Sequence, residues 1–291
     1  MSDMTRERAP FGARLAHAMN EHGPLCVGID PHAGLLNAWG LNDDIAGLRA
    51  FSFTLIEALG GKVAAFKPQS ALFERHGSRG MGVLEEVIAA SREAQTLCIV
   101  DAKRGDIGST MAGYADAFLA DGAPLAGDAL TVSPYLGFGS LTPAVEAAVE
   151  TGRGLFVLCL TSNPEGKQVQ HATAANGHTV AAEIAAAAAQ LNESDKVAGQ
   201  LGSIGLVVGA TIGDAARTLG VDLHAVNGPL LAPGVGAQGA GAQELHDVFG
   251  QARAAVLASS SRGVLNAGPS VEALQKAAFQ AADEARIALR A

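Results

Sequence analysis

The chain has few cysteines, and none is placed for a disulfide framework or a metal centre. Its 291 residues include three, Cys26, Cys98 and Cys159, each inside an apolar run. An odd number without close spacing matches neither a disulfide scaffold nor a metal-binding motif. We therefore interpret all three as small core residues of a protein that works in the reducing cytoplasm.

Positive charge is also scarce. The 29 aspartates and glutamates outnumber the 20 lysines and arginines, which gives a net charge of −9 at pH 7. This balance argues against non-specific binding to nucleic acid. A phosphate-bearing ligand would therefore need a local basic pocket.

Membrane-spanning stretches are missing as well. No segment of 18 residues is apolar enough to cross a bilayer, and the polar N-terminal segment 1–8 leads into no long apolar stretch. The sequence thus predicts no signal peptide and no membrane partner.

Short apolar runs of β type alternate with amphipathic or Ala-rich segments along the whole chain. The runs are 24–31, 62–69, 96–103, 127–135, 154–162, 204–211, 228–235 and 254–261. The segments between and after them are 42–59, 80–95, 109–121, 140–151, 178–192, 213–219, 241–249 and 270–289. Asn42, Ser109, Asp214 and Ser270 are candidate N-caps.

Eight such alternations favour an α/β fold, a (β/α)₈ TIM barrel, over a doubly wound open sheet. No linker-like stretch interrupts the chain, so we expect a single domain over 1–291. An additional N-terminal helix at 10–22 precedes the first strand, and we expect it to cover the bottom of the barrel.

Three of the apolar runs carry charged residues at their carboxyl ends, where this fold places function. Asp30 ends the first run, Lys67 the second, and Asp101 and Lys103 the third. Since side chains alternate along a strand, Asp101 and Lys103 point the same way. Asp106 follows just after Gly105, which permits a tight bend.

This charged group has three interpretations. It is a structural salt-bridge network, a metal site built from Asp30, Asp101 and Asp106, or a metal-free site that handles a proton. The ammonium groups of Lys67 and Lys103 would compete with a cation. Alternating charges instead keep each lysine protonated and held in place, which favours proton handling without a metal.

The ends of the last two runs suggest a phosphate site. The glycine-rich loop 234–239 offers backbone N–H groups with little obstruction, and Arg262 adds a fixed positive fork. The loop also matches G-x-G-x-x-G, but it comes after six earlier strands, which argues against a dinucleotide site. Ordinary tight turns are the alternative explanation for its glycines.

The run 101–110, Asp-Ala-Lys-Arg-Gly-Asp-Ile-Gly-Ser-Thr, resembles the signature of the orotidine 5′-phosphate decarboxylase family. The resemblance extends in order to Asp30, Lys67, the Ser-Asn-Pro at 162–164, the loop 233–239 and the Ser-Arg-Gly at 261–263. It covers nearly the whole chain and is greatest to the larger bacterial subgroup. It implies a cofactor-free and metal-free enzyme that converts orotidine 5′-phosphate to UMP and CO₂, the last step of de novo pyrimidine nucleotide synthesis.

The resemblance also implies roles for single residues. Lys103 would donate a proton to C6 of the pyrimidine, Asp101 would lie beside the substrate carboxylate, and Lys67 would bridge the aspartates and the ribose. Asp30 would bind a ribose hydroxyl. Ser162 would contact the base, and Gln238 and Arg262, with Gly236 and Gly263 in the same two loops, would hold the phosphate.

The implied assembly is a homodimer, in which Asp106 and Thr110 reach across the interface into the site of the neighbouring subunit. One departure concerns closure over the substrate. Some family members carry a longer loop after the seventh strand, with a tyrosine that grips the phosphate, whereas this loop is short and rich in Gly and Ala. We expect the polar segment 163–179 to close over the site instead.

Two rival functions remain. Mg²⁺-dependent sugar-phosphate decarboxylases or aldolases of related barrels share the Asp-x-Lys-x-x-Asp pattern but need an acidic ligand after the second strand. Lys67 occupies that place here, which argues against the metal. A non-catalytic barrel that senses a phosphorylated ligand would be expected to lose part of the charged group, and none of it is missing.

Overall fold

The computed structural model describes residues 8–235 and 240–290. Eight parallel strands follow one another around a closed barrel, in which the first strand pairs with the last. They are β1 (Leu25–Ile29), β2 (Ala65–Pro68), β3 (Leu97–Arg104), β4 (Ala129–Val132), β5 (Gly154–Leu160), β6 (Ile204–Val208), β7 (Leu230–Pro233) and β8 (Val256–Ser260). Each lies within one of the eight predicted runs except β3, which continues one residue further. The barrel is therefore confirmed, and the open sheet is excluded.

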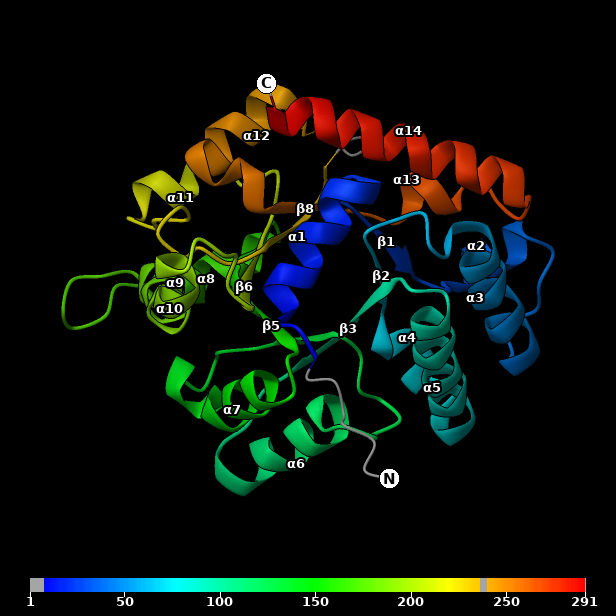
Figure 1. Ribbon diagram of the computed structural model, residues 1–291, viewed down its shortest axis with the longest axis horizontal. Coiled ribbons are helices and arrows are strands. Elements are labelled where there is room, and N and C mark those ends of the chain that lie inside the picture. The colour runs from blue at the N-terminus through cyan, green and yellow to red at the C-terminus, as the bar shows by residue number, and fades with distance from the viewer. Residues whose placement is uncertain (1–7, 236–239, 291) are drawn as a thin grey trace.

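Helices surround the strands, as Figure 1 shows. Those in the predicted segments are α3 (Ile45–Leu59), α5 (Gly77–Glu93), α6 (Gly108–Leu119), α7 (Thr142–Glu150), α9 (Val180–Leu191), α11 (Ala215–Thr218), α12 (Ala242–Phe249) and α14 (Val271–Arg290). Shorter elements that the sequence did not reveal are α2 (Ala33–Ala38), α4 (Ser70–Glu74), α8 (Lys167–Gln170), α10 (Glu193–Val197), α13 (Arg262–Leu265), and the 3₁₀ turns η1 (Phe138–Leu141), η2 (Pro164–Gly166) and η3 (Gly250–Ala255). No helix in the described part of the chain is long and apolar enough to span a membrane.

The predicted N-terminal helix is α1 (Phe11–His22), and it lies across one mouth of the barrel (Figure 1). Phe11 and Leu15 are fully buried and belong to the cluster that fills the barrel interior. The Phe11 ring meets the Phe156 ring of β5 edge to face at 5.9 Å. These contacts close the amino-terminal end of the barrel, so the site must open at the other end.

Helix caps agree with the sequence only in part. Asp44, not Asn42, caps α3, because its side chain accepts the Gly47 N–H at 2.9 Å. Ser109 lies inside the first turn of α6 rather than before it. Asp214 precedes α11 without a side-chain capping bond, whereas the Ser270 hydroxyl accepts the Ala273 N–H at 3.4 Å.

Alternation along each strand places an apolar layer beneath a polar one inside the barrel. Ile99, Ala65, Ala129 and Leu257 belong to the buried interior cluster. Two residues further along each of the same strands come Asp101, Lys67, Thr131 and Ser259, which all line one cavity. Because side chains repeat their direction every second residue, the strands whose apolar residues fill the barrel also place polar side chains at its carboxyl end.

Candidate active site

A cavity of about 750 Å³ opens at the carboxyl ends of the strands. Six of the predicted site residues line it: Asp30, Lys67, Asp101, Lys103, Arg262 and Gly263. They come from β1, β2, β3 and the β8–α13 junction, so segments far apart in the sequence converge here. A volume of this size suits a ligand of nucleotide dimensions.

Asp101 lies between two lysines. Lys67 Nζ donates to Asp101 Oδ2 at 2.7 Å, and Lys103 Nζ donates to Asp101 Oδ1 at 2.5 Å. The side chains of Lys67 and Asp101 are each 8% exposed, while that of Lys103 is 44% exposed. The buried Lys67–Asp101 pair is thus a fixed support, and Lys103 presents its ammonium to the cavity.

Burial and charge act in opposite directions on this pair. Burial alone would raise the pKa of Asp101, but the two lysines outweigh it and lower that pKa to about 2. Burial alone would lower the pKa of Lys67, but Asp101 and then Asp30 outweigh it and raise that pKa above its usual value. Both groups therefore stay ionised at neutral pH, and the Asp101 carboxylate holds the Lys103 ammonium at the cavity.

Asp30 stands at the end of β1 with one oxygen unused. The residue is 9% exposed, and its buried Oδ1 has no hydrogen-bond partner among the described residues. Gly28 permits this arrangement, since a Cβ there would lie 2.1 Å from Ser261 Oγ and 2.8 Å from Asp30 Oδ2. A buried acceptor without a donor is costly, so Asp30 is ready for a ligand hydroxyl.

The end of β8 meets the cavity at its basic side. Arg262 and Gly263 begin α13 there, next to Ser260 and Ser261. Pro233, Gly234 and Val235 of the β7 end line the same wall. Gly236 and Gln238, which the sequence also assigns to phosphate binding, lie outside the described residues.

Three predicted residues lie outside this cavity. Asp106 is half-buried and accepts the Ile107 N–H at 2.8 Å, but it forms no ion pair with Lys67 or Lys103 of its own chain within the described residues. Thr110 and Ser162 are exposed and do not line the cavity.

The segment 163–179 contains η2 and α8 and closes on itself through an antiparallel bridge between Thr173 and Thr179. Gln170 anchors it to the end of β5 by accepting the Thr161 N–H at 2.9 Å. None of its residues lines the cavity, so closure by this segment stays a prediction.

Sequence reasoning missed several residues of the cavity wall. Thr131 lies near the end of β4, Gln69 follows β2, His32 lies in the loop after β1, and Asn266 follows α13. The alternation of β4 points Thr131 inward, and that signal was available in the sequence. No three His, Cys, Asp or Glu side chains in the described ranges converge as a metal-binding group.

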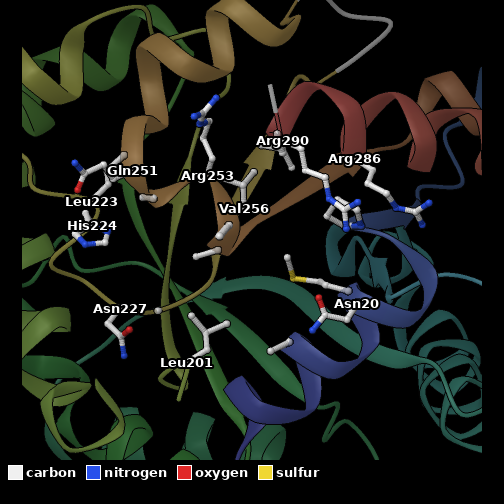
Figure 2. Close-up of a pocket in the computed structure, with 18 residues that line it drawn as sticks. Asn20, Leu201, Leu223, His224, Asn227, Gln251, Arg253, Val256, Arg286 and Arg290 are labelled. Atoms are coloured by element: carbon white, nitrogen blue, oxygen red, sulfur yellow. The ribbon is translucent and has the colours of Figure 1, made fainter. Parts of the chain in front are cut away.

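A second cavity, of about 430 Å³, lies at the amino-terminal end of the barrel (Figure 2). Its walls come from α1, α14, η3 and the loops before β6 and β7. It contains none of the predicted site residues. The chemistry of the lining therefore assigns the active site to the cavity at the carboxyl ends.

The chain matches known proteins over nearly its full length. Residues 23–277 match the model of the Orotidine 5'-phosphate decarboxylase / HUMPS family. An orotidine 5'-phosphate decarboxylase of Streptomyces coelicolor is 58% identical over 97% of this chain and 99% of its own. One of Corynebacterium efficiens is 49% identical over 94% and 96%.

Solved structures agree. A crystal structure from Streptomyces avermitilis is 58% identical, covers 100% of both chains and superposes with a TM-score of 0.94. The Leishmania donovani OMP decarboxylase is 30% identical, covers 95% of this chain and 98% of its own, and has a TM-score of 0.72. With the barrel, the lysine–aspartate cluster and these relatives together, this chain belongs to the orotidine 5'-phosphate decarboxylase / HUMPS family.

Proposed function

We propose that this protein decarboxylates orotidine 5′-phosphate to UMP and CO₂ and uses neither a metal nor a cofactor. Family membership supports the reaction class. The observation that carries the proposal is the placement of Lys103 Nζ, 2.5 Å from a carboxylate that the buried Lys67 fixes from its other side. Lys67 places a positive charge where a metal-dependent barrel needs an acidic ligand.

The chemistry requires a charge to be stabilised at one carbon atom. Loss of CO₂ from C6 leaves an electron pair on that carbon, which the ring does not delocalise as an ordinary enolate. The ammonium of Lys103 would stabilise this pair electrostatically and then transfer a proton to C6. The C–C bond to the carboxylate breaks, a C–H bond forms, and Lys103 regains its proton from water after the product leaves.

Asp101 has two functions in this mechanism. It orients the Lys103 ammonium, and its negative charge lies beside the substrate carboxylate, which disfavours the ground state relative to the transition state. Lys67, together with Lys103, lowers the pKa of Asp101 and so keeps that carboxylate ionised.

The rest of the substrate would be held by the surrounding strand ends. The unused Oδ1 of Asp30 would accept a ribose hydroxyl. Arg262 and Gly263, together with Gly236 and Gln238, would bind the phosphate. Ser162 would contact the base. Binding energy from the phosphate would then be used to hold the pyrimidine against Lys103.

The working unit of this proposal is a homodimer in the cytoplasm. Asp106 and Thr110 do not line the cavity of their own chain, which supports their use in the site of the neighbouring subunit. The three buried free cysteines fit a reducing compartment. We also propose that residues 1–291 form one domain.

The test is a direct assay. Purified protein is incubated with orotidine 5′-phosphate in the presence of EDTA, and loss of the orotate absorbance is followed. We expect turnover that EDTA leaves unchanged. Turnover that depends on added Mg²⁺, or acceptance of a sugar phosphate in place of the nucleotide, would assign the chain to the metal-dependent branch of the family instead.

A further inference from the structure

We propose that Thr131 is a positioning residue that holds both Asp101 and Lys103 for proton transfer. This inference rests on the proposed function. Thr131 is 1% exposed and lies on the cavity wall near the end of β4. Its hydroxyl accepts the backbone N–H of Lys103 at 2.9 Å and donates to Asp101 Oδ1 at 2.9 Å.

An irregularity in β3 explains why a side chain is needed here. β3 pairs with β4 at Ile99–Ala129 and Val100–Leu130, and pairing resumes only at Arg104–Val132. Residues 101–103 of β3 therefore stand opposite Thr131 alone. The bulge interrupts the ladder of backbone hydrogen bonds, and the Thr131 hydroxyl supplies the acceptor that Lys103 N–H lacks.

The bulge also places Lys103 in a conformation that is rare for its residue type. Its φ is +47°, in the left-handed region that favours glycine. Such a backbone persists when the surroundings fix it, and the N–H of the same residue is tied to Thr131. The strain therefore lies at the proposed proton donor.

The three residues form a closed ring of hydrogen bonds. Lys103 N–H donates to Thr131 Oγ1, Thr131 Oγ1–H donates to Asp101 Oδ1, and Lys103 Nζ donates to the same oxygen. The main chain of Lys103 is thereby linked through Thr131 to the same carboxylate oxygen that binds the Lys103 ammonium. The Thr131 hydroxyl can do this because it accepts one hydrogen bond while it donates another, and the methyl group of a valine can do neither.

The experiment replaces the hydroxyl and keeps the shape. Thr131→Val is expected to lower kcat by about 10²-fold, since a small misplacement of the reacting group has an effect of this order. KM is expected to change little, because Thr131 does not touch the proposed phosphate or ribose groups. Thr131→Ser keeps the hydroxyl and is expected to recover most of the lost kcat.

The matched control is Thr142→Val. The Thr142 hydroxyl donates a hydrogen bond to the Gly139 carbonyl at 2.8 Å, but Thr142 is exposed and does not line the cavity. That variant is expected to turn over like the wild type. A Thr131→Val enzyme within twofold of wild-type kcat, or a folded Thr131→Ser enzyme as slow as Thr131→Val, would overturn the proposal.

Hydrogen exchange at the Lys103 amide provides a readout that does not depend on activity. Because Thr131→Val removes the acceptor of that N–H, its exchange is expected to be faster than in the wild type and in Thr131→Ser. Unchanged exchange in Thr131→Val would refute the positioning role even if the wild type failed to decarboxylate the nucleotide. If Thr131→Val does not fold, Thr131→Cys with its weak hydrogen bonds takes its place in both measurements, with the same criteria.

A second, independent observation concerns the 430 Å³ cavity at the amino-terminal end of the barrel, which we call the basal cavity. Its geometry points to a binding site for a phosphate ester that also carries an apolar group. Arg286 and Arg290 of α14 lie on the same side as Asn20 of α1, and His224 and Gln251 lie across from them (Figure 2).

Charge is the first argument for this site. Three arginines, Arg253, Arg286 and Arg290, line the basal cavity, and its described lining includes no aspartate or glutamate. This grouping occurs in a chain whose net charge is −9. Arginines in a lining without carboxylates give the cavity a positive charge, which a bound anion would neutralise.

An unused donor is the second argument. Arg253 Nε donates to the Gly250 carbonyl at 2.9 Å, but the buried Nη1 of the same side chain has no hydrogen-bond partner among the described residues. Arg286 pairs with Asp283 at 3.1 Å on its exposed side. A guanidinium stays charged, so an unpaired buried nitrogen favours an anionic acceptor.

The remaining walls suit a ligand with a less polar part. Leu201, Leu223 and Val256 supply apolar surface, and the side-chain amides of Asn20, Asn227 and Gln251 supply donors and acceptors. The volume lies in the range of small-molecule sites. A nucleoside monophosphate has this combination of groups.

Calorimetry with AMP as the probe tests the site. The Arg262→Ala substitution weakens anion binding in the active site. AMP binding that persists in this variant is therefore assigned to the basal cavity. In this background, Arg290→Gln alone and the double variant Arg253→Gln/Arg290→Gln are each expected to weaken the affinity for AMP at least tenfold. Arg79→Gln, on the exposed part of α5, is expected to leave that affinity unchanged. Inorganic phosphate is expected to bind more weakly than AMP.

Three outcomes would overturn this second proposal. They are the absence of AMP binding in the Arg262→Ala background, equal affinity for AMP in the arginine variants and their parent, and phosphate binding as tight as AMP. Arg290 is exposed, so Arg290→Gln is expected to fold even if the double variant does not.

Discussion

Lys67 of β2 and Asp101 of β3 form an ion pair of 2.7 Å across neighbouring strands, with both side chains 8% exposed. A pair this deeply buried is costly to desolvate, and its value is geometric: it fixes a carboxylate at one place. Lys103, the only exposed member of the cluster, is held by that carboxylate at 2.5 Å. The cluster thus divides into a buried support and an accessible proton donor.

The first prediction concerns Lys103. Lys103→Ala removes the ammonium that would stabilise the charge at C6 and supply the proton, so we expect kcat to fall by roughly 10³-fold or more. Binding of UMP, measured by calorimetry, is expected to remain detectable, because Asp30 and Arg262 are untouched. Near-wild-type turnover would remove Lys103 from the mechanism.

The second prediction concerns acid stability. The pKa of Asp101 is about 2 in the folded chain against an ordinary value of 3.8, so its contribution is complete above about pH 4 and is lost as the pH falls through 3.8 towards 2. The shift corresponds to about 2 kcal/mol. The raised pKa of Lys67 acts at high pH. Its contribution to stability is complete below the ordinary value of 10.5 and is lost only as the pH rises above that value.

Urea unfolding of the wild type and of Asp101→Asn, measured from pH 2 to pH 7, tests this. We expect the variant to be less stable at pH 7, with a gap that narrows as the pH approaches 2. Two curves that stay parallel over the whole range would show that Asp101 does not account for the pH dependence.

The third prediction concerns the shared site. If Asp106 serves the neighbouring subunit, a hybrid of one Lys103→Ala chain and one Asp106→Ala chain contains one site with both residues intact. Mixing the two inactive proteins is therefore expected to restore part of the activity. A mixture that stays inactive after subunit exchange has been demonstrated by mass spectrometry would place Asp106 in its own subunit's site or in none.

The fourth prediction concerns the closed end of the barrel. Phe11 is fully buried against Phe156, so Phe11→Ala is expected to reduce the free energy of unfolding by about 3–5 kcal/mol. KM is expected to change little, since α1 lies at the opposite end from the site. Ile287→Ala is the control, because Ile287 of α14 is 69% exposed. A similar loss of stability in that variant would contradict the prediction that burial of Phe11 stabilises the fold.

Much of the site follows from the sequence because alternation along a strand is a local property. The period of two places Asp101 and Lys103 on one side of β3, and the apolar runs give the strand count. The same reasoning ordered Asp30, Lys67 and Arg262 along the chain as strand ends. It misplaced the cap of α3, because Asn42 and Asp44 are both good caps and only the helix start decides between them.

What the sequence by itself determined is therefore the repeating unit, the residues that end each strand, and the resemblance that names their chemistry. Only the tertiary structure decided the cross-strand contacts: which oxygen of Asp101 meets which lysine, and that Thr131 fills the gap opposite the β3 bulge. Local periodicity is written in neighbouring residues. Register between strands depends on closure of the whole barrel, to which all eight strands contribute.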